Sequence, residues 1–286
     1  MKAFLMTPEQ AMLAQAKMGG YNRNLAKFDP YSGLFIPAEH RPRHANLSTF
    51  GANAAGVDIF SWGTNKLHPL GTMAYTSDGR IFRYCQAGAA DLVVGNIVQS
   101  AAPVANHLAN TPPAVAIGAT SFTYTPGNTA GAENLYAEGT LMVDTTPGNG
   151  YTYQVSGHPA IVASTAFLLT LSDAIQVALT TSSRVGLHTH PMKNVIQTPT
   201  TVTAQTVGGV VAPITAAQYG WLQTRGPFAG LINGTPAVGT GLVSSATTAG
   251  ALDVAAVAAE INVRIIARAM QVGVSGKNNA VYLQLD

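Results

Sequence analysis

The sequence predicts a mainly β protein of many short antiparallel strands, which form one or more sandwich-like or barrel-like β domains. Two observations lead to this prediction. Short runs of alternating apolar and polar residues recur from residue 71 onward, and turns rich in Gly, Pro or Asn separate them. A short helix and an extended arm are expected before this region.

The N-terminal region, residues 1–70, is predicted to hold this helix and arm. Thr7 is suited to cap a helix over residues 7–18, and Pro8 occupies its first position. Residues 21–70 show no sustained hydrophobic period, yet they carry many aromatic residues, in which disordered tails are poor. Two interpretations stay open: an arm that lies on a neighbouring subunit, or an irregular layer on the chain's own domain.

Residues 71–200 are predicted to form a β domain. Asp78 and Gly79 stand between the runs 72–76 and 81–85, and an Asp-Gly pair in this position favours a β-hairpin. The other expected strands are Leu92–Val98, Phe122–Tyr124, Gly139–Val143, Tyr151–Val155, Ala166–Leu171, Ile175–Leu179, Val185–Leu187 and Val195–Gln197.

Residues 201–286 are predicted to form a C-terminal β segment, which packs with 71–200 as one unit or stands apart. The stretch 198–217 is rich in Thr, Val, Gly and Pro, and is either a linker or a set of edge strands. Further strands are expected at 219–224, 261–269 and 280–285, and one or two helical turns at 250–260.

Charged residues are scarce along the whole chain. Asp, Glu, Lys and Arg make up only 10% of its 286 residues, and no Lys or Arg lies between Arg83 and Arg184. Ordinary soluble domains carry about 25% charged residues. Because desolvating a charge is costly, the cores of protein interfaces are depleted in Lys, Glu and Asp. The composition therefore indicates a subunit of a large assembly, whose surface is widely covered by other protein.

The same composition argues against several classes of function. The net charge is +2 and the basic residues are scattered, so no nucleic-acid partner is expected. No apolar run reaches the 18 residues that a membrane span needs, and no membrane partner is expected. Cys85 is the only cysteine, which rules out an intrachain disulfide and predicts an inert thiol.

No motif predicts catalysis, a cofactor or a metal. His188 and His190 have the spacing of two ligands on one side of a strand, but no third ligand lies nearby, so they are interpreted as loop histidines. Gly276–Lys277 lacks the residues of a phosphate-binding loop. The acidic residues considered as catalytic pairs are interpreted as solvated turn residues; they are Glu133, Glu138, Asp144 and Asp173.

Candidate interface residues come from the arm and from two later segments. Tyr219 and Trp221 predict either an aromatic interface anchor or ordinary core packing. Arg264 and Arg268 predict either a grip on an acidic partner or charges that blunt a sheet edge. The full set of candidates is Tyr21, Phe28, Tyr31, Phe35, Arg41, Arg43, Trp62, Tyr219, Trp221, Arg264 and Arg268.

Eight segments follow one another in a recognisable order over residues 70–286: Gly71–Tyr84, Ala87–Ala90, Tyr136–Val143, Gly150–Tyr153, Gly157–Pro159, Tyr219–Thr224, Gly234–Gly239 and Ala280–Leu285. This order of motifs resembles that of structural proteins of tailed-phage particles, and the head decoration or cement proteins in particular. The resemblance lies in the general character and order of the segments and includes no diagnostic catalytic motif.

This resemblance implies a β-rich virion protein on the capsid exterior, with the major capsid protein as its partner and the trimer as its favoured oligomer. It would stabilise contacts between capsomers without catalysing a reaction. The alternatives are another virion component (shell, tail or fibre subunit), a β-fold glycan hydrolase, and a secreted adhesin. A common shell protein should have a long spine helix and a fibre should have repeats, and neither pattern is found in the sequence.

Overall fold

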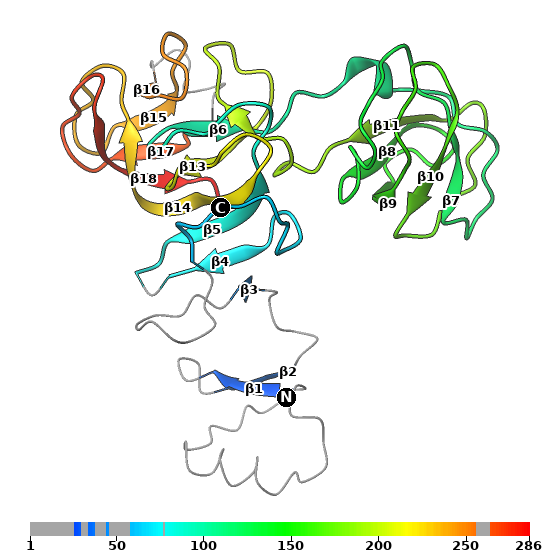
Figure 1. The fold of residues 1–286 in the computed structure, drawn as a ribbon, viewed down its shortest axis with the longest axis horizontal. Coiled ribbons are helices and arrows are strands. Elements are labelled where there is room, and N and C mark those ends of the chain that lie inside the picture. Colours follow the sequence, from blue (N-terminus) through cyan, green and yellow to red (C-terminus); the bar gives the residue numbers. More distant parts are fainter. Residues whose placement is uncertain (1–25, 30–33, 38–43, 46–57, 77, 256–263) are drawn as a thin grey trace, which may run out of the picture. The chain divides into compact units, whose positions relative to one another are not determined.

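The computed structural model describes residues 26–29, 34–37, 44–45, 58–76, 78–255 and 264–286 (Figure 1). The chain divides into two compact units, Met1–His44 and Ala45–Asp286. In the first unit, β1 (Ala26–Asp29) pairs antiparallel with β2 (Leu34–Pro37). The helix expected at 7–18 and most of the expected arm lie outside the described residues.

The second unit contains two curled antiparallel sheets (Figure 1), which confirms the prediction of a mainly β protein. The larger sheet has the order β12-β6-β13-β14-β18-β17-β15-β16, with β5 paired to β14 and β4 paired to β5. Its strands are β4 (Met73–Tyr75), β5 (Ile81–Gln86), β6 (Ile97–Gln99), β12 (Ile196–Gln197), β13 (Thr206–Val210), β14 (Tyr219–Leu231), β15 (Gly241–Ser244), β16 (Leu252–Val254), β17 (Ala267–Ala269) and β18 (Asn278–Gln284). β3 (His44–Ala45) spans the boundary between the units.

The smaller sheet has five strands in the order β11-β8-β9-β10-β7. They are β7 (Ser121–Tyr124), β8 (Thr140–Thr145), β9 (Thr152–Gly157), β10 (Phe167–Leu171) and β11 (Arg184–His188). A short 3₁₀ helix, η2 (Ala105–His107), precedes them. All five strands lie in sequence between β6 and β12, which pair with each other in the larger sheet, so the five-stranded unit is an insertion between two neighbouring strands.

Period-2 alternation explains why these segments form strands with one buried face. In β9, Tyr153 and Val155 are buried, whereas Thr152 and Gln154 are exposed. An antiparallel sheet commonly packs one face on the core and leaves the other to solvent. The buried faces of the five strands form one apolar core, separate from the two cores of the larger sheet.

A polar network lies inside the core of the five-stranded unit. The hydroxyl of Tyr136 contacts Nδ1 of His107 at 2.5 Å, and His107 Nε2 donates to the carbonyl of Thr129 at 2.8 Å. These bonds fix the imidazole tautomer, because Nε2 must carry the proton and Nδ1 must accept. The backbone N–H of Tyr136 donates to Nε2 of a second imidazole, His158, at 3.0 Å, and His158 Nδ1 donates to the carbonyl of Pro159.

The long strand β14 joins two cores of the larger sheet. Its first half pairs with β5 and β13, and its second half pairs with β18. Phe228 lies over Gly209 of β13, where an added Cβ would come within 2.6 Å of the ring atom Cζ. Only glycine therefore leaves room for this aromatic ring.

Several strand predictions are confirmed and others are corrected. β4 and β5 form the expected hairpin, with Gly79 at a φ of +85°. The stretch 198–217 contains β13, which has neighbours on both sides and is therefore an interior strand rather than an edge or a linker. Helical turns were expected at 250–260, but Leu252–Val254 form strand β16. Of the strand expected at 261–269, the described residues form only β17 (Ala267–Ala269), and Ile266 just before it is buried.

Candidate interaction surface

Three large apolar side chains are exposed on the segment that leads into β4. Phe60, Trp62 and Leu67 keep 52%, 45% and 75% of their surface accessible, and we call these three residues the Trp62 surface. The segment is held to the start of β14 by two backbone bonds, from Gly63 N to Tyr219 O at 3.0 Å and from Tyr219 N to Gly63 O at 2.8 Å. The exposed side chains therefore stand on a fixed backbone.

A layer of aromatic rings lies on the protein side of this segment. Tyr84 on β5 is the Cα partner of Trp221 on β14, and their ring centroids are 5.1 Å apart. Tyr219 stacks on Tyr84 at 6.0 Å, and His68 contacts the edge of Tyr84 at 5.1 Å. The hydroxyl of Tyr84 accepts a hydrogen bond from the backbone N–H of Leu67 at 3.0 Å. Sequence positions far apart are thus joined into one rigid support.

A carboxylate from the five-stranded unit also holds the same segment. Glu138 accepts a hydrogen bond and ion pair from Lys66 through Oε1, and accepts the backbone N–H of Leu70 through Oε2 at 2.8 Å. Burial alone raises the pKa of Glu138, but the bonds from Lys66 and Leu70 outweigh it and lower this pKa below its usual value. Lys193 also donates to the carbonyl of Asn134, which adds a second polar contact between the two sheets.

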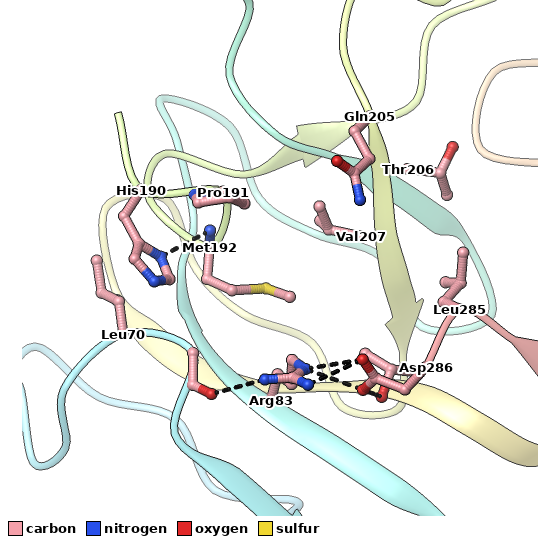
Figure 2. A pocket seen from close by; sticks show the side chains of 12 residues that line it. Leu70, Arg83, His190, Pro191, Met192, Gln205, Thr206, Val207, Leu285 and Asp286 are labelled. Atoms are coloured by element: carbon pink, nitrogen blue, oxygen red, sulfur yellow. Dashed lines mark hydrogen bonds and ion pairs between the residues drawn. The ribbon is translucent and has the colours of Figure 1, made fainter. Parts of the chain in front are cut away.

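A pocket of about 280 Å³ opens near Leu70, at the end of the segment (Figure 2). Figure 2 shows Arg83 turned toward Asp286, and its guanidinium contacts the carboxylate at 2.9–3.1 Å. Arg83 also donates to the carbonyl of Gly71 at 3.2 Å, while Thr224 donates to Asp286 at 2.5 Å. Both charged groups thus have partners within the protein, which is the arrangement of a structural ion pair.

The remaining titratable group of the pocket is His190. Its Nδ1 accepts the backbone N–H of Met192 at 3.1 Å, which leaves the proton on Nε2. Burial lowers the pKa of His190, Glu138 raises it, and the positive charges of Lys66, Lys193 and Arg83 lower it further. The imidazole is therefore neutral at pH 7. The pocket thus combines a neutral imidazole, a closed Arg83–Asp286 ion pair and a lining of mixed polar and apolar side chains.

The structure brings together three of the interface candidates chosen from the sequence. Trp62 is exposed, Tyr219 is half-buried and Trp221 is buried, and all three lie at the start of β14. Arg264 and Arg268 are exposed and turn to different carbonyls, those of Leu285 and Gly239. Of the arm candidates, Phe28 and Phe35 are Cα partners in β1 and β2. The others lie outside the described residues: Tyr21, Tyr31, Arg41 and Arg43.

Sequence reasoning missed two parts of this site. Phe60 and Leu67 carry no periodic signal, because their segment is irregular. Glu138 and Lys66 are 72 residues apart, and no spacing rule links them. Cys85, in contrast, agrees with the expected inert thiol, since burial raises its pKa to about 12.

Comparison with protein-family models, with curated proteins and with solved structures returned no match for this chain. Within the described ranges, no group of three or more His, Cys, Asp or Glu side chains is arranged to hold a metal ion. The helical content of the same ranges includes no segment that is long and apolar enough to cross a bilayer. The function is therefore inferred from the geometry of the Trp62 surface and from the sequence.

Proposed function

We propose that this protein is a structural component of a tailed-phage particle, which binds the capsid exterior and stabilises contacts between capsomers. Its partners are the major capsid protein and further copies of itself, with a trimer favoured. It acts by binding and not by catalysis. The observation that carries the proposal is the Trp62 surface, which presents three exposed apolar side chains on a backbone held by hydrogen bonds to Tyr84 and Glu138.

Preorganisation makes such a surface useful for binding. A loop that becomes ordered on binding loses conformational entropy, which lowers the affinity, whereas a loop that is already fixed does not. Trp and other aromatic residues dominate binding hot spots because they bury a large area with few rotatable bonds. Phe60 and Trp62 meet this description, and the stacked rings of Tyr84 and Tyr219 hold the backbone beneath them.

The magnitude of the binding energy favours attachment to a repetitive lattice. Full burial of a large apolar side chain contributes about 1.5–3 kcal/mol. Scaled by their exposed fractions of 52%, 45% and 75%, Phe60, Trp62 and Leu67 together supply roughly 3–5 kcal/mol. One such contact gives weak association once the entropy cost of binding is included. Several contacts made at once by an oligomer on a shell raise the avidity without new chemistry.

The arm over residues 1–70 is proposed as an additional clasp on a neighbouring subunit. The scarcity of charge supports the same role, since only 10% of the chain is charged. The curled sheets of the second unit then serve as a barrel-like or sandwich-like scaffold that holds the contact surfaces.

Binding to shell particles assembled without this protein tests the proposal. We expect the wild-type protein to co-sediment with the particles and to be visible on their exterior by electron microscopy. The double variant Phe60→Ser and Trp62→Ser should bind at least tenfold more weakly. Val202→Ser is the matched control, because Val202 is similarly exposed at 49% and lies away from the Trp62 surface in sequence. Absence of wild-type binding would contradict the proposed function.

A further inference from the structure

Two loops beyond the end of β14 expose a second group of apolar side chains. The loops cover residues 234–240 and 270–277, and hydrogen bonds join the first loop to the second and to the last residue of β17. Gly273 N donates to Pro236 O at 2.8 Å, Gly239 N to Ala269 O at 2.7 Å, and Gly234 N to the hydroxyl of Ser275 at 3.0 Å. The exposed side chains, which we call the tip surface, are Val238 at 63%, Met270 at 46%, Val272 at 64% and Val274 at 56%.

A buried asparagine holds the second loop in one conformation. Asn279 is only 4% exposed, and its side chain uses its full bonding capacity. Oδ1 accepts from Gln271 Nε2 at 3.1 Å and from Val274 N at 3.2 Å. Nδ2 donates to the carbonyls of Val274 at 3.0 Å and Lys277 at 2.8 Å. The loop is therefore preorganised, and its apolar side chains face solvent although polar residues would serve a solvated loop.

The charged side chains described beside the tip surface are two cations and one carboxylate that is already hydrogen-bonded. Arg268 donates to the carbonyl of Gly239 at 3.2 Å, and Lys277 is exposed on the second loop. The carboxylate of Asp253, on strand β16, already accepts hydrogen bonds from the amide of Asn233 at 2.7 Å and from the backbone N–H of Val254 at 2.8 Å. A complementary partner would thus present apolar side chains edged by carboxylates.

The tip surface and the Trp62 surface adjoin opposite ends of one strand. β14 has 13 residues, and its first residue, Tyr219, bonds to Gly63 beside the Trp62 surface. Ile232, one residue past its end, donates to Lys277 at 3.0 Å and accepts from Gly276 at 2.8 Å on the tip loop. At 3.3 Å per residue the path along the strand between these ends is roughly 40 Å, and the irregularity at Gly226 makes the direct distance shorter. The two surfaces therefore lie at different ends of the strand.

We infer that the tip surface is a second docking site, which takes an apolar protein surface edged by carboxylates on a neighbouring shell subunit. This inference rests on the proposed function and deepens it, because two docking sites at the ends of one strand would let each copy bridge two subunits. Contact between two copies of the tip surface is disfavoured, since it would bring Arg268 and Lys277 of one copy against the same cations of the other.

Substitutions of opposite charge at one position provide the test. Val272→Glu and Val272→Lys remove the same apolar group, but only the first adds a charge that an acidic-edged partner repels. With the same shell particles, we expect Val272→Glu to weaken binding at least 100-fold, in line with loss of one of two linked contacts. We expect Val272→Lys to weaken it at least fivefold less than the Glu variant. Val202→Glu is the control, and near-UV circular dichroism checks that each variant folds.

The outcomes separate this inference from the proposed function. If the wild-type protein binds and both Val272 variants bind within twofold of it, the second docking site does not exist. If Val272→Lys is weakened as much as Val272→Glu, the partner is not edged by carboxylates and the inference is wrong. If sedimentation without particles shows that Val272→Glu dissociates an oligomer while particle affinity is unchanged, the occupant is a second copy, and the inference is again overturned. If the wild type does not bind, the proposed function fails first.

Discussion

Removal of one hydroxyl from the core of the five-stranded unit should destabilise the protein measurably. In the Tyr136→Phe variant the ring and its packing remain, but Nδ1 of His107 loses its partner. Tyr136 is 1% exposed and His107 is 0% exposed, so water cannot replace the hydroxyl without opening the core. The second ring nitrogen of His107 already donates to the carbonyl of Thr129, so a change of tautomer would break that bond instead.

The expected cost is that of a buried acceptor left without a donor, about 1–3 kcal/mol. For a cooperative unit of about 150–250 residues, each kcal/mol corresponds to about 2–4 °C in melting temperature. Urea unfolding followed by circular dichroism measures the difference directly. Tyr151→Phe is the matched control, because Tyr151 lies in the same unit and is 42% exposed. Its free energy of unfolding should stay within about 0.5 kcal/mol of the wild type.

One result would refute this reasoning. If Tyr136→Phe unfolds at the same urea concentration as Tyr151→Phe, the contact between Tyr136 and His107 contributes nothing net. The polar network would then be tolerated by the core and would not specify its structure.

Three further predictions concern acidity, the contact of Glu138 with residues 66–70, and packing. Burial lowers the pKa of His158 below its usual value of 6.5; Lys193 and His107 lower it further, while the carbonyl of Pro159 and Glu133 oppose the shift. The contribution of His158 to stability is therefore complete above pH 6.5 and declines as the pH falls below that value. Urea unfolding at pH 7.5 and 5.5 should show this loss of stability, and the loss should be smaller in His158→Gln. Glu138→Gln should cost no more than about 1 kcal/mol, since the pair with Lys66 is about one-third exposed. Amide exchange over 58–70 should nevertheless accelerate, and unchanged exchange would show that Glu138 does not hold this segment. Gly209→Ala should cost about 1–3 kcal/mol by overpacking against Phe228, whereas Gly63→Ala, which meets no atom within 4 Å, should be neutral in the same thermal melt.

Local chemistry made the strands of the five-stranded unit predictable. Turn residues and period-2 alternation are properties of neighbouring positions, so β7, β8, β9 and β10 were located to within two residues. Strand β14 was predicted only over 219–224, because Gly226 and Pro227 are typical strand breakers. The strand continues through them because its register shifts between Gln223 and Arg225 and Gly226 adopts a φ of +96°, an irregularity that tolerates both residues.

The candidate site was predictable only where the residue type itself is informative. Trp62 and Tyr219 were selected as aromatic interface candidates, and the structure places both at the start of β14. The support beneath them depends on pairing across the sheet, such as Tyr84 with Trp221, and sequence alone does not give that register. The tip surface was missed for the same reason, since Val238 and Met270 lie 32 positions apart in the sequence and are brought together only by bonds between their loops.

The connection of the five-stranded unit to the larger sheet has a consequence for protein engineering. Gln99 and Ile196 are Cα partners on adjacent strands, so residues 100–195 leave and re-enter the chain at neighbouring points. A tight turn placed between these two residues would close the chain and keep the pairing of β6 with β12 at this point, but it would remove the bridge between Ala87 and Val195. The same two residues mark a site at which another protein domain can be inserted in place of residues 100–195 and so be displayed on the target that this protein binds.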